Sequence, residues 1–334
     1  LYSQTRKYDY IFADYTRYYR EDRIKSYTRQ FVYLRPEKNT QLDYIVIFDR
    51  VTTATPEILK GWEINMAYDP KINGEEEKVK EGVWEYRGAN LIEITNDVDP
   101  DPYSGKVHEE AHGKLYVKTL LPKKVKIVKI GGSGYEFAND LGENKGVDAD
   151  YKYLRGAGAL FTGTYFVDVI STEDKAKENF LHFLQTADAN RDQDLVRNEL
   201  IEGVGCVGVH IDKSEGQSEW VVIFSEEEEE REVISYRIES YNSGGEVRHL
   251  VADLKPGYEY TIYQDGEEIG KRVSSEAGTI YFTTQGGGEI KIISKGHVAR
   301  PEIEIEKRVN KNVVGKGGEI TYELKIKNVG DGIG

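Results

Sequence analysis

Short apolar runs, rich in β-branched and aromatic residues and bounded by turn residues, recur along this chain. The most apolar of them, residues 42–51, reads Leu-Asp-Tyr-Ile-Val-Ile-Phe-Asp-Arg-Val and lies between Pro36 and Pro56. It is too short to span a membrane and predicts a strand buried on both faces. Residues 28–34 alternate polar and apolar side chains, and the intervening loop has the length to fold the two strands antiparallel. The chain therefore opens with a meander in a large sheet.

The same kind of pattern continues to residue 293. Segments 83–86 and 90–95 predict one hairpin, and segments 114–121 and 124–130 predict another around Pro122-Lys123. Further strands are predicted at residues 8–19 (with a turn), 60–68, 163–170, 180–186, 203–211 and 220–225. From residue 233 the spacing shortens, which predicts a smaller sheet of five strands at residues 233–240, 248–254, 258–264, 278–284 and 288–293.

These patterns predict an all-β protein, because no long helical heptads interrupt them. A chain of 334 residues is too long for one ordinary core. We expect a large antiparallel β-sandwich over residues 1–232, a small antiparallel β domain over residues 233–295, and a linker with a partial Ig-like module over residues 296–334. Leu1 already lies inside a strand pattern, so the natural N-terminus is expected upstream.

Charge changes this picture locally. The net charge of -14 argues against nucleic acid as a partner. Residues 1–40, however, hold nine Lys and Arg against five acidic residues, together with eight tyrosines. Such a segment suits stacking on sugar rings while Arg holds carboxylates, although a half-buried sheet face with solvated charges is a more common interpretation. Abundant Glu and Lys with a single Met and a single Cys suit a thermophile.

Three motifs resemble functional sites, but their sequence context argues against the corresponding activity. Residues 108–112 read His-Glu-Glu-Ala-His, the spacing of a zinc protease, but Gly113 and the strand after it leave too little length for the required helix. Residues 131–134 are glycine-rich, yet no Gly-Lys-Ser/Thr and no helix pattern follow, so a phosphate loop is not expected. Cys206 lies in a buried-strand pattern, where an inert thiol is expected. As the single cysteine it excludes an internal disulfide.

An acidic segment near the middle of the chain has the spacing of a calcium loop. Oxygen-bearing side chains fall at loop positions 1, 3, 5, 7 and 12. They are Asp188, Asn190, Asp192, Asp194 and Glu199. Gln193 stands where such a loop usually has Gly, and a strand pattern precedes the segment instead of a helix. Calcium binding and a plain acidic surface loop both remain open.

Several ordered blocks of sequence resemble the β-sheet domain of the heparinase II/III-like family of polysaccharide lyases. They are Tyr-Asp-Tyr, Ala-Asp-Tyr-Thr, Arg-Gln-Phe-Val-Tyr-Leu and Ile-Val-Ile-Phe-Asp-Arg-Val within residues 8–51, and then residues 113–122, 131–137, 180–185, 252–257 and 276–282. The likeness spans roughly residues 8–294. Separately, residues 301–328 are similar to the first half of an Ig-like repeat of prokaryotic surface proteins.

The resemblance implies a two-part enzyme. An upstream helical toroid carries a catalytic Tyr and His, the β-sandwich packs against it, and acidic polysaccharides are cleaved by β-elimination. These 334 residues hold no toroid pattern, so the segment is not expected to be catalytic by itself. The family also places a His in the strand after the Phe-Asp-Arg-Val block, where this chain has Asn65. His112 matches one family zinc ligand, and a single ligand does not hold zinc tightly, so zinc is not expected.

Two functions follow from these observations. The first is the non-catalytic β portion of an extracellular heparinase II/III-like protein that contacts acidic polysaccharide or packs on the toroid. Its expected substrate contacts are Arg17, Tyr18, Tyr19, Arg20 and Trp62. The second is a structural cell-surface protein, of the surface-layer or filament type, that retains the lyase scaffold without activity and has other cell-surface proteins as partners. Both imply an extracellular or cell-surface location with no membrane span in this segment.

Overall fold

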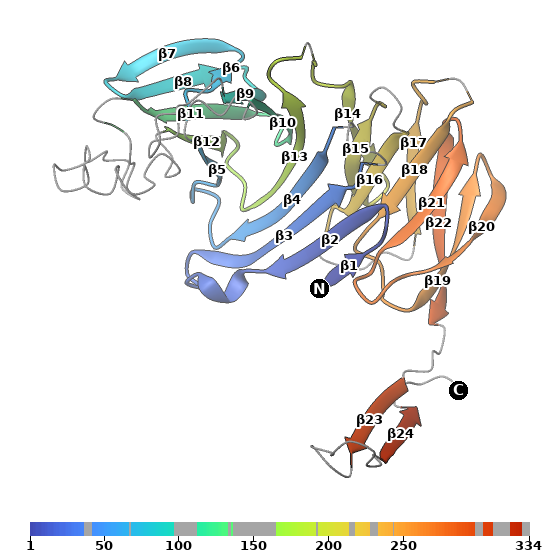
Figure 1. The fold of residues 1–334 in the computed structure, drawn as a ribbon. Helices are drawn as coiled ribbons and strands as arrows, with labels where there is room; N and C mark the ends of the chain where they lie inside the picture. The colour runs from blue at the N-terminus through green and yellow to red at the C-terminus, as the bar shows by residue number, and fades with distance from the viewer. Residues whose placement is uncertain are drawn as a thin grey trace, which may run out of the picture.

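The computed structural model describes residues 1–36, 42–66, 68–96, 112–132, 135, 165–191, 193–213, 218–227, 233–242, 244–297, 303–309 and 321–328. These residues form 24 β-strands and a single short 3-10 helix, η1 (Thr16–Tyr18), as Figure 1 shows. The prediction of an all-β fold with a large sandwich and smaller sheets is confirmed. The part of the chain described here contains no helix with the length and apolar composition of a membrane span.

An eight-stranded antiparallel sheet forms the centre of the molecule. Its spatial order is β1 (Tyr2–Gln4), β2 (Tyr8–Asp14), β3 (Ile24–Leu34), β4 (Tyr44–Thr53), β13 (Lys177–Asp188), β10 (Gly113–Leu121), β9 (Leu91–Asn96) and β6 (Lys71–Ile72). The apolar run around Phe48 forms β4, whose alternate residues enter two different cores. Tyr44, Val46 and Phe48 pack on one side, while Ile45 and Ile47 pack on the other. The predicted strand buried on both faces is confirmed.

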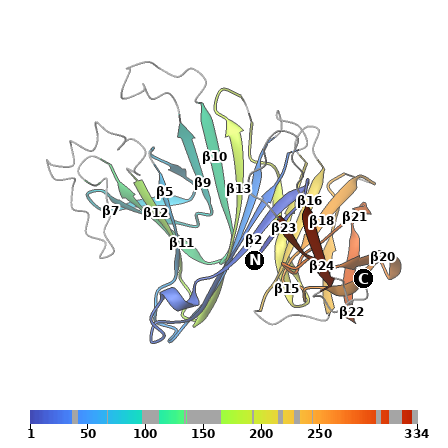
Figure 2. The same cartoon turned by 60° about the horizontal axis from the view of Figure 1, so that its bottom comes forward.

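A five-stranded sheet covers part of one face of the eight-stranded sheet (Figure 2). Its order is β5 (Gly61–Met66), β12 (Tyr165–Ser171), β11 (Val125–Gly131), β8 (Val83–Arg87) and β7 (Glu75–Lys80). The two predicted hairpins are wrong, because β8 and β9 lie in different sheets, and so do β10 and β11. The turns at Gly88 and Pro122 therefore carry the chain from one layer of the sandwich to the other.

A second five-stranded sheet covers the opposite face of the central sheet, and a four-stranded sheet packs on the far side of that second sheet. One has the order β14 (Asn198–Gly203), β15 (Cys206–Ile211), β16 (Glu219–Ser225), β18 (Glu246–Val251) and β21 (Ile280–Gln285). The other has the order β17 (Val233–Ile238), β22 (Gly288–His297), β19 (Tyr258–Gln264) and β20 (Glu267–Val273). The expectation that strands after residue 233 form a sheet of their own is wrong. β18 pairs in parallel with β16, and the chain between them contributes β17 to the neighbouring sheet.

A buried ion pair joins the central sheet to this second group of sheets. The Arg50 guanidinium donates to both carboxylate oxygens of Asp253, at 3.0 and 3.2 Å, and also to the backbone oxygen of Ser225 at 3.0 Å. Gln30 donates to the same carboxylate at 2.9 Å. Around these groups, Phe48 stacks on Phe224 with ring centroids 4.8 Å apart. The central sheet and the β14–β21 sheet therefore share one continuous core.

One region of the central sheet remains open. Ile11, Phe31 and Ile47 are in register across β2, β3 and β4, so they point to the same face. Ile47 packs under the five-stranded sheet, whereas Ile11 is 44% exposed. The five-stranded sheet therefore ends near β4, and this face of β1 to β3, which we call the open sheet face, is solvent-accessible.

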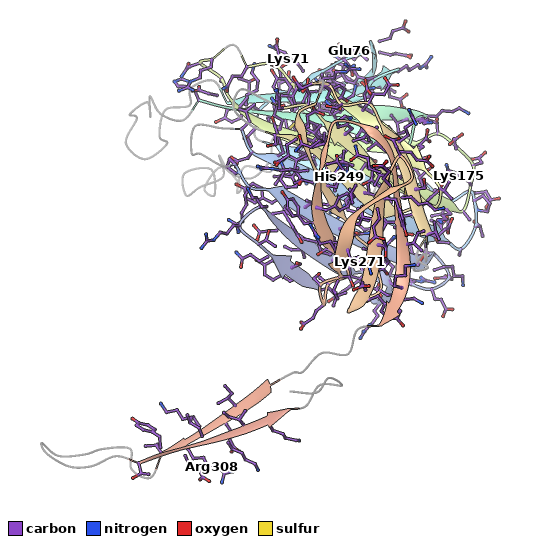
Figure 3. The ribbon with its side chains drawn as sticks, turned by 90° about the vertical axis from the view of Figure 1, so that its right-hand side faces the viewer. Lys71, Glu76, Lys175, His249, Lys271 and Arg308 are labelled. Atoms are coloured by element: carbon purple, nitrogen blue, oxygen red, sulfur yellow. The ribbon has the colours of Figure 1, made fainter. Side chains whose placement is uncertain are left out.

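A two-stranded hairpin follows the sheets. β23 (Ile303–Val309) and β24 (Tyr322–Asn328) pair antiparallel, and Figures 1 and 3 draw them apart from the other strands, with Arg308 labelled in Figure 3. Ile305, Leu324 and Ile326 are 59 to 64% exposed. The Ig-like character of this segment stays a prediction.

Candidate functional site

Four tyrosines gather beside the open sheet face, where β2 passes through η1 into β3. The Asp14 carboxylate accepts the backbone N–H of Thr16 at 2.8 Å, and the Thr16 hydroxyl accepts the backbone N–H of Tyr27 at 3.1 Å. These bonds hold the turn against β3. The ring of Tyr15 lies 6.1 Å from that of Tyr18 and 5.4 Å from that of Tyr27, and Tyr19 meets Tyr27 edge-on at 5.7 Å. We call Tyr15, Tyr18, Tyr19 and Tyr27 the tyrosine cluster.

The tyrosine cluster presents flat apolar surface to solvent. Tyr18 is 81% exposed, Tyr19 48% and Tyr15 38%. Tyr27 is half-buried, and this burial raises the pKa of its phenol. A group of large aromatic side chains left exposed side by side is informative, because contiguous apolar patches on a surface often mark binding sites. Their rings are therefore available to stack on a planar or sugar-like ligand.

A pocket of about 390 Å³ adjoins the cluster. It lies between the open sheet face and the edge strand β5, and its volume falls in the range of about 300 to 1,000 Å³ that is typical of ligand pockets. Tyr19 and Tyr27 line one side, and Gly61 and Glu63 of β5 line the other. The remaining lining residues are Ile24, Arg29, Asp49, Val51, Thr53, Ile58, Leu59, Lys60 and Phe180.

Arg29 and Asp49 form a two-bond ion pair in this pocket. Nε and Nη2 of Arg29 donate to the two carboxylate oxygens of Asp49, at 2.7 and 2.8 Å. The Asp49 side chain is 3% exposed, whereas that of Arg29 is 36% exposed. Burial raises the pKa of Asp49, and the bonds from Arg29 oppose this effect. The Arg29 guanidinium lies 5.9 Å from the centroid of the Tyr27 ring. The pocket therefore places a positive charge next to an aromatic ring.

The residues expected from the sequence to contact substrate fall into two groups. Arg17, Tyr18, Tyr19 and Arg20 all lie exposed on or beside η1. Arg20 is bound to Asp22, with Nε at 2.9 Å and Nη2 at 2.6 Å from the carboxylate. Trp62, by contrast, is 5% exposed and lies in the core between the sheets. Trp62 is therefore not part of the exposed surface, because its strand alternation directs it inward with Ile64 and Met66.

His182 is the partner of Trp62 in that core. The two rings stack with centroids 4.1 Å apart, and the Nδ1 atom of His182 lies 3.2 Å from the Thr119 hydroxyl. Complete burial lowers the pKa of His182 to about 3, so the ring is neutral at physiological pH. Among the described residues, its Nε2 atom has no hydrogen-bond partner. This histidine is enclosed and does not reach the pocket surface.

Asn65 stands on β5 in register with Phe166 of β12, and its side chain is exposed. It lies on the opposite face of β5 from Trp62, because successive side chains alternate along a strand. Asn65 and His182 are thus on different sides of the five-stranded sheet, so the two side chains do not contact the same ligand.

The residues of the predicted calcium loop begin with Asp188 at the end of β13 and end with Glu199 in β14, with Asn190 and Asp194 between the two strands. Asp188 accepts the backbone N–H of Asn190 at 2.9 Å and pairs with Arg191 at 3.1 Å. Glu199 accepts two bonds from Arg197, at 3.0 and 2.6 Å, and Asp194 is exposed. Asp192 lies outside the described residues. Calcium binding stays a prediction.

His112 comes directly before β10, and its backbone oxygen accepts the N–H of Ala189 at 3.1 Å. His108 lies outside the described residues. Within the described ranges, no group of three or more His, Cys, Asp or Glu side chains is placed to hold a metal ion.

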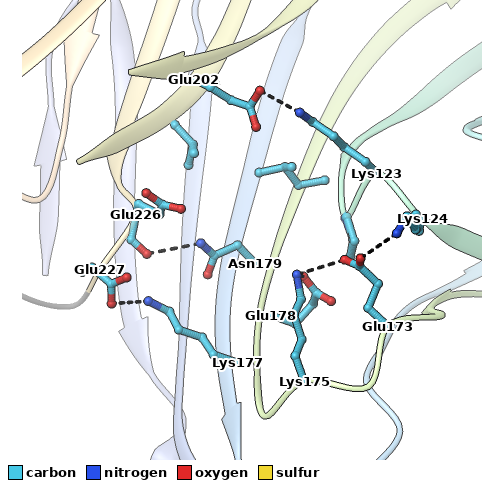
Figure 4. Close-up of a pocket in the computed structure, with 13 residues that line it drawn as sticks. Lys123, Lys124, Glu173, Lys175, Lys177, Glu178, Asn179, Glu202, Glu226 and Glu227 are labelled. Carbon is cyan, nitrogen blue, oxygen red and sulfur yellow. Dashed lines mark hydrogen bonds and ion pairs between the residues drawn. The ribbon is translucent and has the colours of Figure 1, made fainter. Parts of the chain in front are cut away.

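A second cleft, of about 350 Å³, lies where the central sheet meets β14 to β16 (Figure 4). Lys123 bonds Glu202 at 2.7 Å, Lys124 bonds Glu173 at 3.1 Å and Lys175 bonds Glu178 at 2.9 Å. Lys177 pairs with Glu227. Each of the four lysines is thus neutralised by a glutamate, and the cleft offers an anion no uncompensated positive charge.

Comparison with known proteins bears on the C-terminal part of the chain. Residues 200–294 match the family model of the heparinase II C-terminal domain. The match runs from within β14 to within β22, so it covers most of the β14–β21 sheet, which packs on the central sheet, and of the four-stranded sheet stacked on it. The chain therefore contains a heparinase-like C-terminal β domain. A search among curated proteins found no match.

Proposed function

We propose that this chain is the β-sandwich portion of a heparinase II/III-like protein and binds acidic polysaccharide through the tyrosine cluster and its pocket. The observation that carries the proposal is the exposed set of Tyr15, Tyr18 and Tyr19 beside a pocket that contains a guanidinium group. Aromatic faces stack on sugar rings, and arginine binds carboxylates through directed hydrogen bonds. The heparinase-like domain at residues 200–294 supports the same class of ligand.

The pocket suits binding better than proton transfer. Tyr27 has a raised pKa and stays protonated at neutral pH, so it is a poor base. Asp49 is held in two bonds by Arg29. A β-elimination needs a base for the sugar C5 proton and an acid for the leaving oxygen. In this proposal, those groups come from a part of the protein outside these residues.

The proposal is tested by binding measurements with a polyuronate. We expect the Tyr18→Ala/Tyr19→Ala variant to bind about tenfold more weakly, because two stacking contacts of about 0.5 to 1.5 kcal/mol each are lost. Isothermal titration calorimetry measures this. The matched control is Tyr322→Ala, because Tyr322 is 53% exposed but lies on the β23–β24 hairpin. Wild-type protein that binds no acidic polymer, or equal affinities for the two variants, would contradict the proposal.

A second function is favoured by Asn65, which replaces the histidine that the family resemblance implies and is exposed on β5. It is a structural cell-surface protein that retains the lyase scaffold without its chemistry. The two functions differ in an assay of the full-length protein on uronate polymers. Absorbance of an unsaturated product supports the lyase, whereas no product on any such polymer supports the structural protein.

A further inference from the structure

We propose that Arg29 is the residue that recognises the carboxylate of one uronate unit in the pocket, while Tyr27 stacks on the sugar ring and Asp49 positions the guanidinium. This inference rests on the proposed function and names the ligand group at the same site.

The hydrogen-bonding pattern of Arg29 carries the inference. Asp49 accepts hydrogen bonds from Nε and Nη2 of Arg29, which form one edge of the planar guanidinium. For Nη1, the described part of the chain contains no hydrogen-bond partner. The outer hydrogens on Nη1 and Nη2 form a second pair of donors that matches the spacing of two carboxylate oxygens. A buried carboxylate behind the guanidinium thus fixes its plane and leaves this edge for a ligand.

Burial distinguishes Arg29 from Arg20, the arginine that follows Tyr19 of the cluster. The Arg20 side chain is 80% exposed, and its partner Asp22 is 61% exposed. Such a pair is screened by water and loses side-chain entropy when it binds. Arg29 is only 36% exposed, its partner is buried, and it lines the pocket. A hydrogen bond made at Arg29 is therefore stronger and better oriented than one made at Arg20.

The charges around the pocket indicate how the ligand is selected. Lys60 and Arg29 face Asp49 and Glu63, so the formal charges of the lining are balanced. Lys60 is itself held by the backbone oxygen of Ile58 at 2.9 Å. The protein as a whole carries a net charge of -14. The net charge of the whole protein therefore does not favour anion binding, and selectivity depends on directed bonds from Arg29 at short range.

The test compares three soluble ligands: an oligouronate, a neutral oligosaccharide of the same linkage, and a sulfated form of that neutral oligosaccharide. The variant Arg29→Gln/Asp49→Asn keeps a hydrogen-bonded pair and keeps the net charge of the protein. We expect it to bind the oligouronate about tenfold more weakly and the neutral oligosaccharide within about twofold of wild type. The matched control is Arg308→Gln/Glu306→Gln, which removes an exposed pair with bonds of 2.9 and 2.8 Å in the β23–β24 hairpin. It should leave all affinities unchanged.

A second variant, Arg29→Lys, tests the proposal if the doubly substituted protein does not fold. Lysine retains the positive charge beside Asp49 but lacks the paired N–H donors of a guanidinium. We therefore expect the affinity for the oligouronate alone to fall at least fivefold. An equal loss on the neutral ligand would overturn the proposal, because Arg29 would then only support the pocket structure. A loss confined to the sulfated ligand would overturn the assignment to a carboxylate. If wild-type protein binds none of the three ligands, the proposed function itself fails, which is a different result.

Discussion

Asp168 shows how a single side chain makes stability depend on pH. It lies on β12 in register with Glu63 of β5, and its Oδ1 atom is buried without a hydrogen-bond partner in the part of the chain that the structure describes. Burial and, next, the Glu63 carboxylate raise the pKa of Asp168 to about 7, although Lys126 opposes them. The folded protein therefore holds this proton more tightly than the unfolded chain. Its contribution to stability is complete below about pH 4 and is lost as the pH rises to about 7.

Replacing this carboxyl group tests the effect. We expect Asp168→Asn to stabilise the protein by about 1 to 2 kcal/mol at pH 8, a value reduced for the partial exposure of the site. The gain should shrink at pH 5, where wild-type Asp168 is protonated in the folded state. Urea denaturation at both pH values measures it, and Glu63→Gln should reproduce part of the gain. An identical effect of Asp168→Asn at the two pH values would contradict the pKa assignment.

Individual site residues were predictable only in part. Tyr18 and Tyr19 are exposed, as the composition of a tyrosine-rich basic segment suggests, and their contact with a ligand stays a prediction. Trp62 lies in the core, which its residue type does not reveal but the apolar residues at 62, 64 and 66 indicate, because they share one face of the strand. The ion pair of Arg29 and Asp49 could not be predicted from the sequence. The available signal was an Asp inside the most apolar run of the chain, but its partner depends on the register of β3 with β4.

At the level of strands, the ion pair of Arg50 and Asp253 holds β4 against the chain that follows β18. Arg50 is 4% exposed and Asp253 is 12% exposed. Asp253 has a backbone φ of 58°, in the left-handed region that Asp and Asn tolerate better than most residues. Asn is therefore the substitution that removes the charge with little change in backbone preference.

We expect Asp253→Asn to destabilise the protein by about 3 to 5 kcal/mol, because it leaves the Arg50 guanidinium buried without a counter-charge. Urea denaturation measures the change. The control is Glu202→Gln, which breaks the exposed pair with Lys123, whose side chains are 61% and 56% exposed. That loss should be under about 1 kcal/mol. Similar losses in the two variants would show that the buried pair contributes no more than a surface pair.

Strands were predicted better than their partners. Alternation is a local property, so β8, β9, β10 and β11 could be located near their observed positions. Whether a short turn folds a strand back within one sheet, or carries it to the facing sheet, depends on strands far away in sequence. The turns at Gly88 and Pro122 are of the second kind, and nothing in their own residues distinguishes the two cases.

For the whole molecule, the sequence was sufficient to predict an all-β architecture but not the grouping of its strands. The parallel pair of β16 and β18 requires a crossover through another sheet, and no local pattern marks it. The expected boundary at residue 232 falls within this crossover. The range matched by the heparinase II C-terminal domain starts at residue 200, close to the beginning of β14.

The position of β13 between β4 and β10 has a consequence for how the protein is synthesised. Residues 54–176 separate β4 from β13, so on the ribosome β4 emerges long before its central neighbour exists. Until then the nascent chain presents an uncovered apolar edge of the kind that aggregates or recruits chaperones. We expect β4 to resist protease in stalled chains only after Asp188 has left the exit tunnel. Protection in chains that end before Lys177 would show that the amino-terminal strands fold without it. The separation of β4 and β13 along the sequence thus sets how long the nascent chain exposes this edge and depends on chaperones.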